Sequence, residues 1–360
     1  MAERKPKTAL RKGWTTGACA LAAASAAWKA LLTGGFPDPV GVRLPKGEMP
    51  SFPLSRKELA NGHATAGIVK DAGDDPDVTH GAEIVVTVTR GAPGTGVVFK
   101  AGPGVGTVTR PGLALSVGEA AINPKPRQMI ADAIRDIAHE CAVAPDAVVT
   151  VSIPGGEELA KKTMNGRLGI QGGLSVLGTT GIVIPYSCAS WIHSIHRGID
   201  VARAAGLTHV AGATGKTSEA AVQKMYDLPE IALIDMGDFA GGLLKYLAKH
   251  PIGKLTVAGG LGKLAKLGQG HLDLHSSRSR LDMKKLASAL GDLGADAATR
   301  ERIEGANTAH EALEVAAAAG IDLAGLVAKR AREVALASAG TGTEIEVLVF
   351  DRAGKLIGRA

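Results

Sequence analysis

The pattern of apolar and polar positions changes near residue 187, and the part before it mixes helices with short strands. A run of small apolar residues over 18–32 predicts a helix, with Thr15 and Thr16 placed to cap it and Gly34 placed to end it. A second helix is expected over 126–141, because a proline stands near its start. Short β-branched runs bounded by turn residues predict strands at 40–44, 64–70, 84–90, 96–100 and 147–153.

After residue 187 the pattern alternates between helices and short apolar strands. Residues 187–205 predict a helix with Trp191, Ile195 and Ile199 on one face. Strands are expected at 208–211, 231–235, 255–258 and 344–351, with helices at 282–293, 307–319 and 321–338. Strand–helix–strand repetition indicates a parallel sheet with right-handed crossovers. We therefore expect an α+β domain over 1–186, followed by an α/β domain over 187–360 with a short, mostly parallel sheet of Rossmann-like alternation.

Composition and charge narrow the class of partner. The chain has 360 residues, 45% of them hydrophobic, which is enough for two cores. Its net charge of +6 favours anionic partners, but aromatic residues are only 3% and the basic residues are scattered. Basic residues are closely spaced only near the N-terminus, at Arg4, Lys5, Lys7, Arg11 and Lys12. A small polycarboxylate or phosphate compound therefore fits better than nucleic acid.

The cysteines and the apolar runs favour a cytoplasmic protein. Cys19, Cys141 and Cys188 are far apart and form no metal-binding or disulfide pattern. The chain shows no signal-peptide pattern and no apolar run of membrane-spanning length. We expect no membrane partner, and a homo-oligomer is one of the states left open.

Three of the C-terminal strands end in turns of small residues. The turns are 212–218 (GATGKTS), 235–238 (DMGD) and 259–263 (GGLGK). In open α/β sheets, ligands lie at the carboxyl ends of strands. Together the turns indicate a site for a nucleotide-like or sulfonium cofactor, although any one of them alone is more often an ordinary strand–helix connection. The first turn is not a phosphate-binding P-loop, because Val210 stands where that pattern needs glycine.

The N-terminal half carries another glycine-rich turn, over 102–106 (GPGVG). It lacks the dinucleotide fingerprint, because its third glycine comes one residue too soon. It fits a tight turn where the backbone approaches a ligand and a plain hairpin about equally well.

An acidic segment over 71–80 is a candidate for acid–base chemistry. It contains Asp71, Asp74, Asp75, Asp77 and His80. Carboxylates so close raise one another's pKa, which suits a base, a cation site or the positioning of a substrate. The competing interpretation is a turn rich in solvated acids.

Two further groups of residues are candidates for binding a metal or a carboxylate. His271, Asp273 and His275 alternate and would share one face of a strand, but they lack a fourth ligand, so no metal is expected. Arginine and lysine can clamp a carboxylate. The candidates are Lys125, Arg127, Lys161, Lys162 and Arg167.

Longer stretches resemble a known family. These are LRKGWTTGACA (10–20), VKDAGDDPDVTHGAEI (69–84), GPGVGTVTRPGL (102–113), INPKPR (122–127), the segment 153–187, GATGKTSE (212–219) and HSSRS (275–279). Their order along the chain resembles the cobalt-precorrin-5B C1-methyltransferase family of cobalamin biosynthesis (CbiD). The resemblance implies transfer of a methyl group from S-adenosylmethionine to ring carbon C1 of an anionic tetrapyrrole, giving cobalt-precorrin-6A. It also implies an α+β domain followed by an α/β domain.

On this hypothesis the second domain binds S-adenosylmethionine and the glycine-rich first domain closes over the macrocycle. The expected cofactor residues are Gly212, Thr214, Gly215, Lys216, Thr217, Ser218, Asp235, Gly237, Gly259 and Gly260. The expected substrate residues are Thr15, Thr16, Gly104, Lys161, Lys162, Arg167, Thr179 and Thr180. Asp71, Asp75 and His80 are the candidates for positioning or proton handling.

Two other classes remain as alternatives. A nicotinamide-dependent oxidoreductase would use the same strand ends, with Asp235 on a ribose, but the missing GxGxxG counts against it. A non-catalytic module for nucleic acid or another polyanion is the second, and the dispersed charge counts against it.

Overall fold

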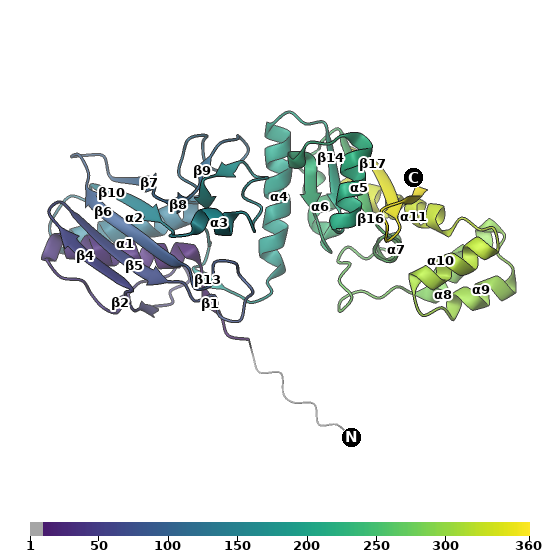
Figure 1. Ribbon diagram of the computed structural model, residues 1–360, viewed down its shortest axis with the longest axis horizontal. Helices are drawn as coiled ribbons and strands as arrows, with labels where there is room; N and C mark the ends of the chain where they lie inside the picture. Colours follow the sequence, from purple (N-terminus) through teal and green to yellow (C-terminus); the bar gives the residue numbers. More distant parts are fainter. Residues whose placement is uncertain (1–9) are drawn as a thin grey trace, which may run out of the picture. The chain divides into compact units, whose positions relative to one another are not determined.

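The computed structural model describes residues 10–360, so Arg4, Lys5 and Lys7 lie outside the described part. The chain divides into two compact units, Met1–Ser187 and Cys188–Ala360, each built around buried hydrophobic residues of its own. Both units combine helices with sheets in a mixed α/β fold (Figure 1).

The N-terminal unit contains a five-stranded sheet covered by two helices (Figure 1). The strand order is β4-β5-β6-β10-β7, and every pair is antiparallel except β10 with β7. Helix α1 (Thr16–Thr33) packs on β5 and β6, and α2 (Pro124–Glu140) packs beside α1. The strands are β4 (Arg56–Ala60), β5 (His63–Val69), β6 (Glu83–Arg90), β7 (Val97–Ala101) and β10 (Ala147–Ser152).

Helix α1 forms where the sequence predicts it and is buried along most of its length. The Thr15 hydroxyl accepts a hydrogen bond from the Ala18 amide at 3.1 Å, which caps the first turn. Gly34 ends the helix in the left-handed conformation, at φ 84°. The many alanines let α1 lie close to the sheet and to α2, where Trp28 Nε1 donates to the Ile134 carbonyl at 3.2 Å.

The glycine-rich segments of this unit pair with one another in two-residue strands. Strand β8 (Gly104–Val105) lies parallel to β12 (Gly173–Leu174). Gly104 has φ +77°, and a Cβ there would overlap the Ile153 carbonyl. The hairpin interpretation of 102–106 is therefore wrong, and the close approach that requires this glycine is to the chain's own backbone. The other short elements are β1 (Gly13–Trp14), β2 (Val40–Gly41), β3 (Ser51–Phe52), β9 (Thr107–Val108), β11 (Ile170–Gln171), β13 (Ile182–Val183) and α3 (Gly156–Ala160).

The C-terminal unit is built on a second five-stranded sheet with the order β15-β14-β16-β17-β18. The first four strands are parallel and β18 is antiparallel. The parallel pairing expected from the alternating pattern is thus confirmed. The strands are β14 (His209–Ala213), β15 (Leu233–Asp235), β16 (Lys254–Gly260), β17 (Glu344–Phe350) and β18 (Leu356–Arg359).

Helices cover both faces of this sheet. Along β14, Val210 contributes to the larger core cluster and Ala211 to the smaller one, because successive strand residues point to opposite faces. Helix α5 (Lys216–Tyr226) supplies Val222 to the smaller cluster. The larger cluster includes residues of α4 (Cys188–Ala204), α6 (Ala240–Leu247), α7 (Leu261–Gly268) and α11 (Leu323–Ala339).

Three further helices, α8 (Met283–Ala289), α9 (Ala297–Glu304) and α10 (Ala309–Ala318), form a group within the C-terminal unit (Figure 1). Several sequence-based boundaries need correction here and elsewhere. The expected helix over 282–293 stops at Ala289 and continues only as a 3₁₀ turn, Gly291–Leu293. The expected strand over 40–44 is limited to Val40–Gly41. The elements that the sequence patterns missed include β4, β18, α7 and α9.

Candidate functional site

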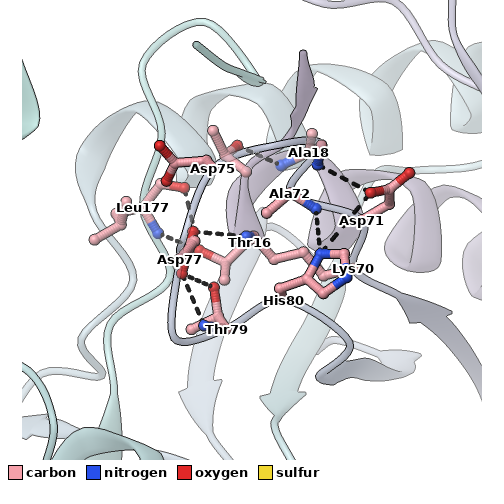
Figure 2. A network of polar contacts seen from close by, with 12 residues as sticks. Thr16, Ala18, Lys70, Asp71, Ala72, Asp75, Asp77, Thr79, His80 and Leu177 are labelled. Carbon is pink, nitrogen blue, oxygen red and sulfur yellow. Dashed lines mark hydrogen bonds and ion pairs between the residues drawn. The ribbon is translucent and has the colours of Figure 1, made fainter. Parts of the chain in front are cut away.

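Two regions contain most of the predicted site residues. The first is the loop over 70–82 between β5 and β6, here called the acid loop. Figure 2 shows its side chains beside the start of α1. Lys70 is only 1% exposed and donates to Asp77 Oδ2 at 2.7 Å. Asp77 Oδ1 accepts from both the amide and the hydroxyl of Thr79. This buried ion pair holds the base of the loop.

Asp71 and His80 lie at the exposed side of the acid loop. Asp71 accepts two hydrogen bonds from the Arg11 guanidinium and one from the Gly73 amide. The Arg11 contact, followed by the Gly73 amide, lowers the pKa of Asp71 to about 2. His80 Nδ1 accepts the Ala72 amide at 3.1 Å, so a neutral ring carries its proton on Nε2.

Asp75 holds the end of the N-terminal unit. Its Oδ1 accepts the backbone amide of Tyr186 at 2.7 Å, and Tyr186 has a positive φ of 56° with an exposed ring. A non-glycine residue in this conformation is strained unless its surroundings hold it. The carboxylate of Asp75 is one of the groups that hold it.

The expectation that the crowded acids raise one another's pKa is wrong. Each acid has a donor of its own, and Asp74 accepts the Arg11 amide at 2.6 Å. Burial acts to raise the pKa of Asp77, but the hydrogen bonds from Lys70 and Thr79 outweigh it and the pKa is lowered. The loop therefore presents stabilised carboxylates and not a shared proton.

The predicted substrate residues fall into two groups within this unit. Thr16 exchanges hydrogen bonds with the backbone of Leu177 beside the acid loop, and Thr180 bonds to Ile182, while Thr179 is exposed. Thr15 is nearby as the cap of α1. Gly104, Lys161, Lys162 and Arg167 belong to the second group, around α3, β8 and β12. Lys161 pairs with Glu158 at 2.6 Å, and Lys162 is exposed.

The second region is the carboxyl edge of the C-terminal sheet, defined by the turns 214–218, 236–238 and 260–263. The parallel register places Ala213 opposite both Asp235 and Ala258, so the strand ends are level. Helices α5, α6 and α7 begin directly after these turns, and no side chain caps their first amides. Helices α8 to α11 all have a side-chain cap, from Asp282, Asp296, Thr308 and Asp322.

Lys263 connects all three turns, and sequence analysis did not select it. Its Nζ donates to the Thr214 carbonyl at 2.8 Å and lies 3.1 Å from Asp238 Oδ1. That distance makes an ion pair, yet Oδ1 is buried and receives no hydrogen bond from residues 10–360. The attraction is thus electrostatic, and the oxygen retains a lone pair for another donor.

Some glycines of the carboxyl edge are required by close packing, and others are not. Gly212 and Gly259 are needed for packing, because a Cβ on Gly212 would overlap Leu243 and one on Gly259 would lie 2.7 Å from Thr214 Oγ1. Gly215 and Gly260 face open space. Gly215 is the N-cap of α5, and the Ser218 hydroxyl donates to the Gly215 carbonyl.

Trp191 on α4 also reaches this edge. Its Nε1 donates to the Asp235 carbonyl at 3.0 Å, and Gly237, with φ +52°, lies against the indole. The spacing of Trp191, Ile195 and Ile199 predicted one shared face, yet Ile195 and Ile199 are buried while Trp191 is 46% exposed. The indole therefore lies partly exposed beside the turn that follows β15.

Asp273 is used within its own loop. It accepts from Arg278 Nη1 at 2.8 Å and from the His275 amide at 3.1 Å, and His275 Nδ1 bonds to Ser277. Within residues 10–360 no group of three or more histidine, cysteine or acidic side chains is placed to hold a metal. In the same part of the chain, no helix combines the length and apolarity needed to cross a membrane.

These features define a mixed α/β protein in which three turns meet at the carboxyl ends of parallel strands, the place where open α/β sheets bind ligands. The CbiD family profile matches residues 3–185, and the profile of its C-terminal domain matches residues 273–360. The chain belongs to the CbiD family, as the resemblance predicted.

Relatives of high identity support this assignment. The chain is 60% identical over 354 residues to a Brucella anthropi protein named cobalt-precorrin-5B C(1)-methyltransferase, covering 98% of this chain and 96% of that one. A Brucella abortus (strain S19) protein of the same name is 59% identical over 360 residues, covering 99% and 98%. The crystal structure of the cobalamin biosynthesis protein CbiD from Archaeoglobus fulgidus is 29% identical, with a TM-score of 0.41, and covers 75% of this chain and 83% of that one.

Proposed function

We propose that this protein methylates ring carbon C1 of cobalt-precorrin-5B, with S-adenosylmethionine as the methyl donor. The observation that carries the proposal is the near-full-length identity of about 60% to relatives named for this reaction. In the step, the bond between sulfur and the methyl carbon breaks and a bond from that carbon to C1 forms. The sulfur keeps the electron pair, so the products are cobalt-precorrin-6A and S-adenosylhomocysteine.

The carboxyl edge of the C-terminal unit is the proposed cofactor site. Three features support it: level strand ends, uncapped amides at the starts of α5 and α7, and the exposed indole of Trp191. Free amides suit the hydroxyls and ring nitrogens of a nucleoside, and an indole suits its base. On this proposal the unit over 187–360 acts as a Rossmann-like cofactor domain.

The N-terminal unit, over 1–186, is the proposed tetrapyrrole-binding unit. Its glycine-rich segments and the exposed Lys162 suit a substrate with several carboxylate arms. Arg11 and Asp71 already satisfy each other, so Asp71 is proposed to position the loop and not to accept a proton. His80 presents Nε2–H to solvent and is the better candidate for contact with substrate.

This chemistry needs alignment more than a reactive side chain. The electron-rich macrocycle supplies the nucleophilic carbon, and the sulfonium supplies a good leaving group. Holding the two reactants in line and excluding water accounts for catalysis without a catalytic nucleophile.

Substitution of Gly215 by leucine tests the proposed cofactor site. Gly215 has φ 173° and ψ 168°, an extended conformation open to any residue, and a Cβ there meets nothing within 4 Å. We expect an unchanged melting temperature and at least a tenfold loss of S-adenosylhomocysteine affinity by calorimetry. Gly305→Leu, at a position with only ordinary contacts, is the control. Equal affinity in Gly215→Leu, or tighter binding of NADH by the wild type, would contradict the assignment.

A further inference from the structure

The HSSRS motif, residues 275–279, has no role in the proposal so far, yet its loop lies at the carboxyl edge. The Leu274 amide donates to the Asp238 carbonyl at 2.8 Å, and the Gly241 amide donates to the Leu272 carbonyl at 2.8 Å. Lys266 Nζ donates to the Leu274 carbonyl at 2.9 Å. These bonds fix the loop beside the turn that follows β15.

Within the loop, Arg278 is held by a carboxylate while its guanidinium remains accessible. Asp273 Oδ2 accepts from Nη1 at 2.8 Å, and Asp273 Oδ1 accepts the His275 amide, so one carboxylate fixes both the turn and the arginine. The Arg278 and His275 backbones are also joined, amide to carbonyl, at 2.9 Å. The Arg278 side chain is 55% exposed, which leaves guanidinium donors for a ligand.

Trp191 of α4 contacts the same turn as the loop that carries Arg278. The Asp273 carboxylate, followed by the Cys188 side chain, raises the pKa of Arg278. Cys188 is three residues before Trp191, so both side chains lie on one face of the helix. Trp191 in turn donates to the Asp235 carbonyl and lies against Gly237. The loop that carries Arg278 and the indole of Trp191 therefore both contact the 235–238 turn, the loop through the Leu274 amide and the Asp238 carbonyl.

We propose that Arg278 binds the carboxylate of the amino-acid end of the cofactor, with Asp273 as its positioning residue. This inference rests on the proposed function. S-adenosylmethionine has a nucleoside end, which the turns and Trp191 suit, and an amino-acid end, whose carboxylate needs a cation. Lys263 is already committed to Thr214 and Asp238, whereas arginine offers a two-pronged match to a carboxylate.

Two ligands that differ in the amino-acid carboxylate distinguish a specific role of Arg278 from a general loss of binding. S-adenosylhomocysteine carries the carboxylate, and 5′-methylthioadenosine has the same nucleoside without it. We expect Arg278→Ala in the full chain to weaken S-adenosylhomocysteine about 10- to 100-fold by calorimetry and to leave methylthioadenosine affinity unchanged. Arg278→Lys should recover part of the loss. Asp273→Asn should also lower the affinity for S-adenosylhomocysteine relative to that for methylthioadenosine, by a smaller factor than Arg278→Ala does.

Arg280→Ala is the matched control, because Arg280 is an exposed arginine two residues further along the chain. It should change neither affinity. Three results with the variants would overturn the inference: an Arg278→Ala protein that binds both ligands as the wild type does, one that loses both equally, or a loss seen in Lys216→Ala instead. A wild-type protein that binds methylthioadenosine and S-adenosylhomocysteine with equal affinity would also overturn the inference. The proposed nucleoside site would stand in that case. Failure of the wild type to bind either ligand would instead overturn the proposed cofactor site and the inference together.

Discussion

A buried lysine paired with one aspartate is the residue-scale feature on which the acid loop depends. Lys70 is buried beside Cys19, whose thiol is kept neutral because burial raises its pKa to about 12. Asp77 is therefore the group that compensates the Lys70 ammonium, at 2.7 Å. A buried charge that loses its partner is far more costly than the absence of the pair.

Asp77→Asn should therefore destabilise the N-terminal unit strongly. We expect a loss of about 3–5 kcal/mol in the free energy of unfolding, since the ammonium is left unpaired. Asparagine keeps an oxygen that can accept from the amide and hydroxyl of Thr79. The loss of stability therefore measures the removal of the negative charge beside Lys70. The double variant Lys70→Met/Asp77→Asn should recover most of the loss. Urea denaturation followed by Trp28, which is buried in this unit, measures both. A double variant no more stable than Asp77→Asn would refute the pairing argument.

Asp71 should titrate far below an ordinary aspartate. Its pKa of about 2 is lower than the usual 3.8, so the ionised form is the one that the fold stabilises. That contribution is complete above the unfolded pKa and is lost as the pH falls through the folded one. Carbon-13 NMR of the side-chain carboxyl should show a midpoint near 2, and Arg11→Ala should move it up. A midpoint near 3.8 in the wild type would contradict the Arg11 contact.

At this scale the sequence identifies candidate residues but not their partners. Asp71, Asp75 and His80 stand out because acids and histidine crowd one glycine-rich segment. The Gly73 and Ala72 amides are close in sequence to the groups they bond, but Arg11 and the Tyr186 amide are far from theirs. Without those partners the direction of the Asp71 and Asp77 pKa shifts could not be predicted.

At the scale of elements, glycines join the short strands of the N-terminal unit. Gly104→Ala should be much more damaging than Gly94→Ala, although both glycines have positive φ, +77° and +80°. A Cβ on Gly94 meets nothing within 4 Å, so only the backbone penalty of about 1–2 kcal/mol applies. A Cβ on Gly104 also overlaps the Ile153 carbonyl and separates β8 from its neighbours. Equal melting temperatures for the two variants would refute this packing.

A buried carboxylate joins the strands at the other end of the C-terminal sheet. Glu346 on β17 accepts from Tyr226 at 2.6 Å, Thr256 at 2.9 Å and Arg359 at 2.9 Å. Glu346→Ala leaves the Tyr226 and Thr256 hydroxyls without this acceptor, and we expect a loss of about 2–3 kcal/mol in unfolding free energy. Tyr226→Phe should lose about 1 kcal/mol. Urea denaturation followed by Trp191 tests both, and equal stability of Glu346→Ala and wild type would exclude a structural role for the network.

Sequence patterns predicted the longer elements better than the short ones. Helix α1 is a long run of small apolar residues with recognisable ends, and strands β5, β6 and β10 are apolar or β-branched runs bounded by turn residues. Strand β4 (RKELA) is polar and exposed throughout, so it forms through pairing with β5 and not through burial. The two-residue strands depend on contacts between distant glycine segments, which no local pattern reveals.

At the scale of the whole molecule, the family was recognisable from motif order, whereas the site was only partly so. The three strand-end turns were predicted together because each follows an apolar strand. Lys263 and Trp191 join the carboxyl edge through tertiary contacts, and the loop that carries Arg278 joins it through the Leu274 amide, so spacing alone could not select them. The roles of the two units in binding cofactor and tetrapyrrole remain predictions.

Incubation of the full chain with cobalt-precorrin-5B and S-adenosylmethionine labelled with carbon-13 in the methyl group tests the central claim most directly. NMR of the product should show one new labelled methyl group at ring carbon C1, with S-adenosylhomocysteine formed in equal amount. Label at another ring carbon, or no transfer by a protein that binds both ligands, would contradict the proposed reaction.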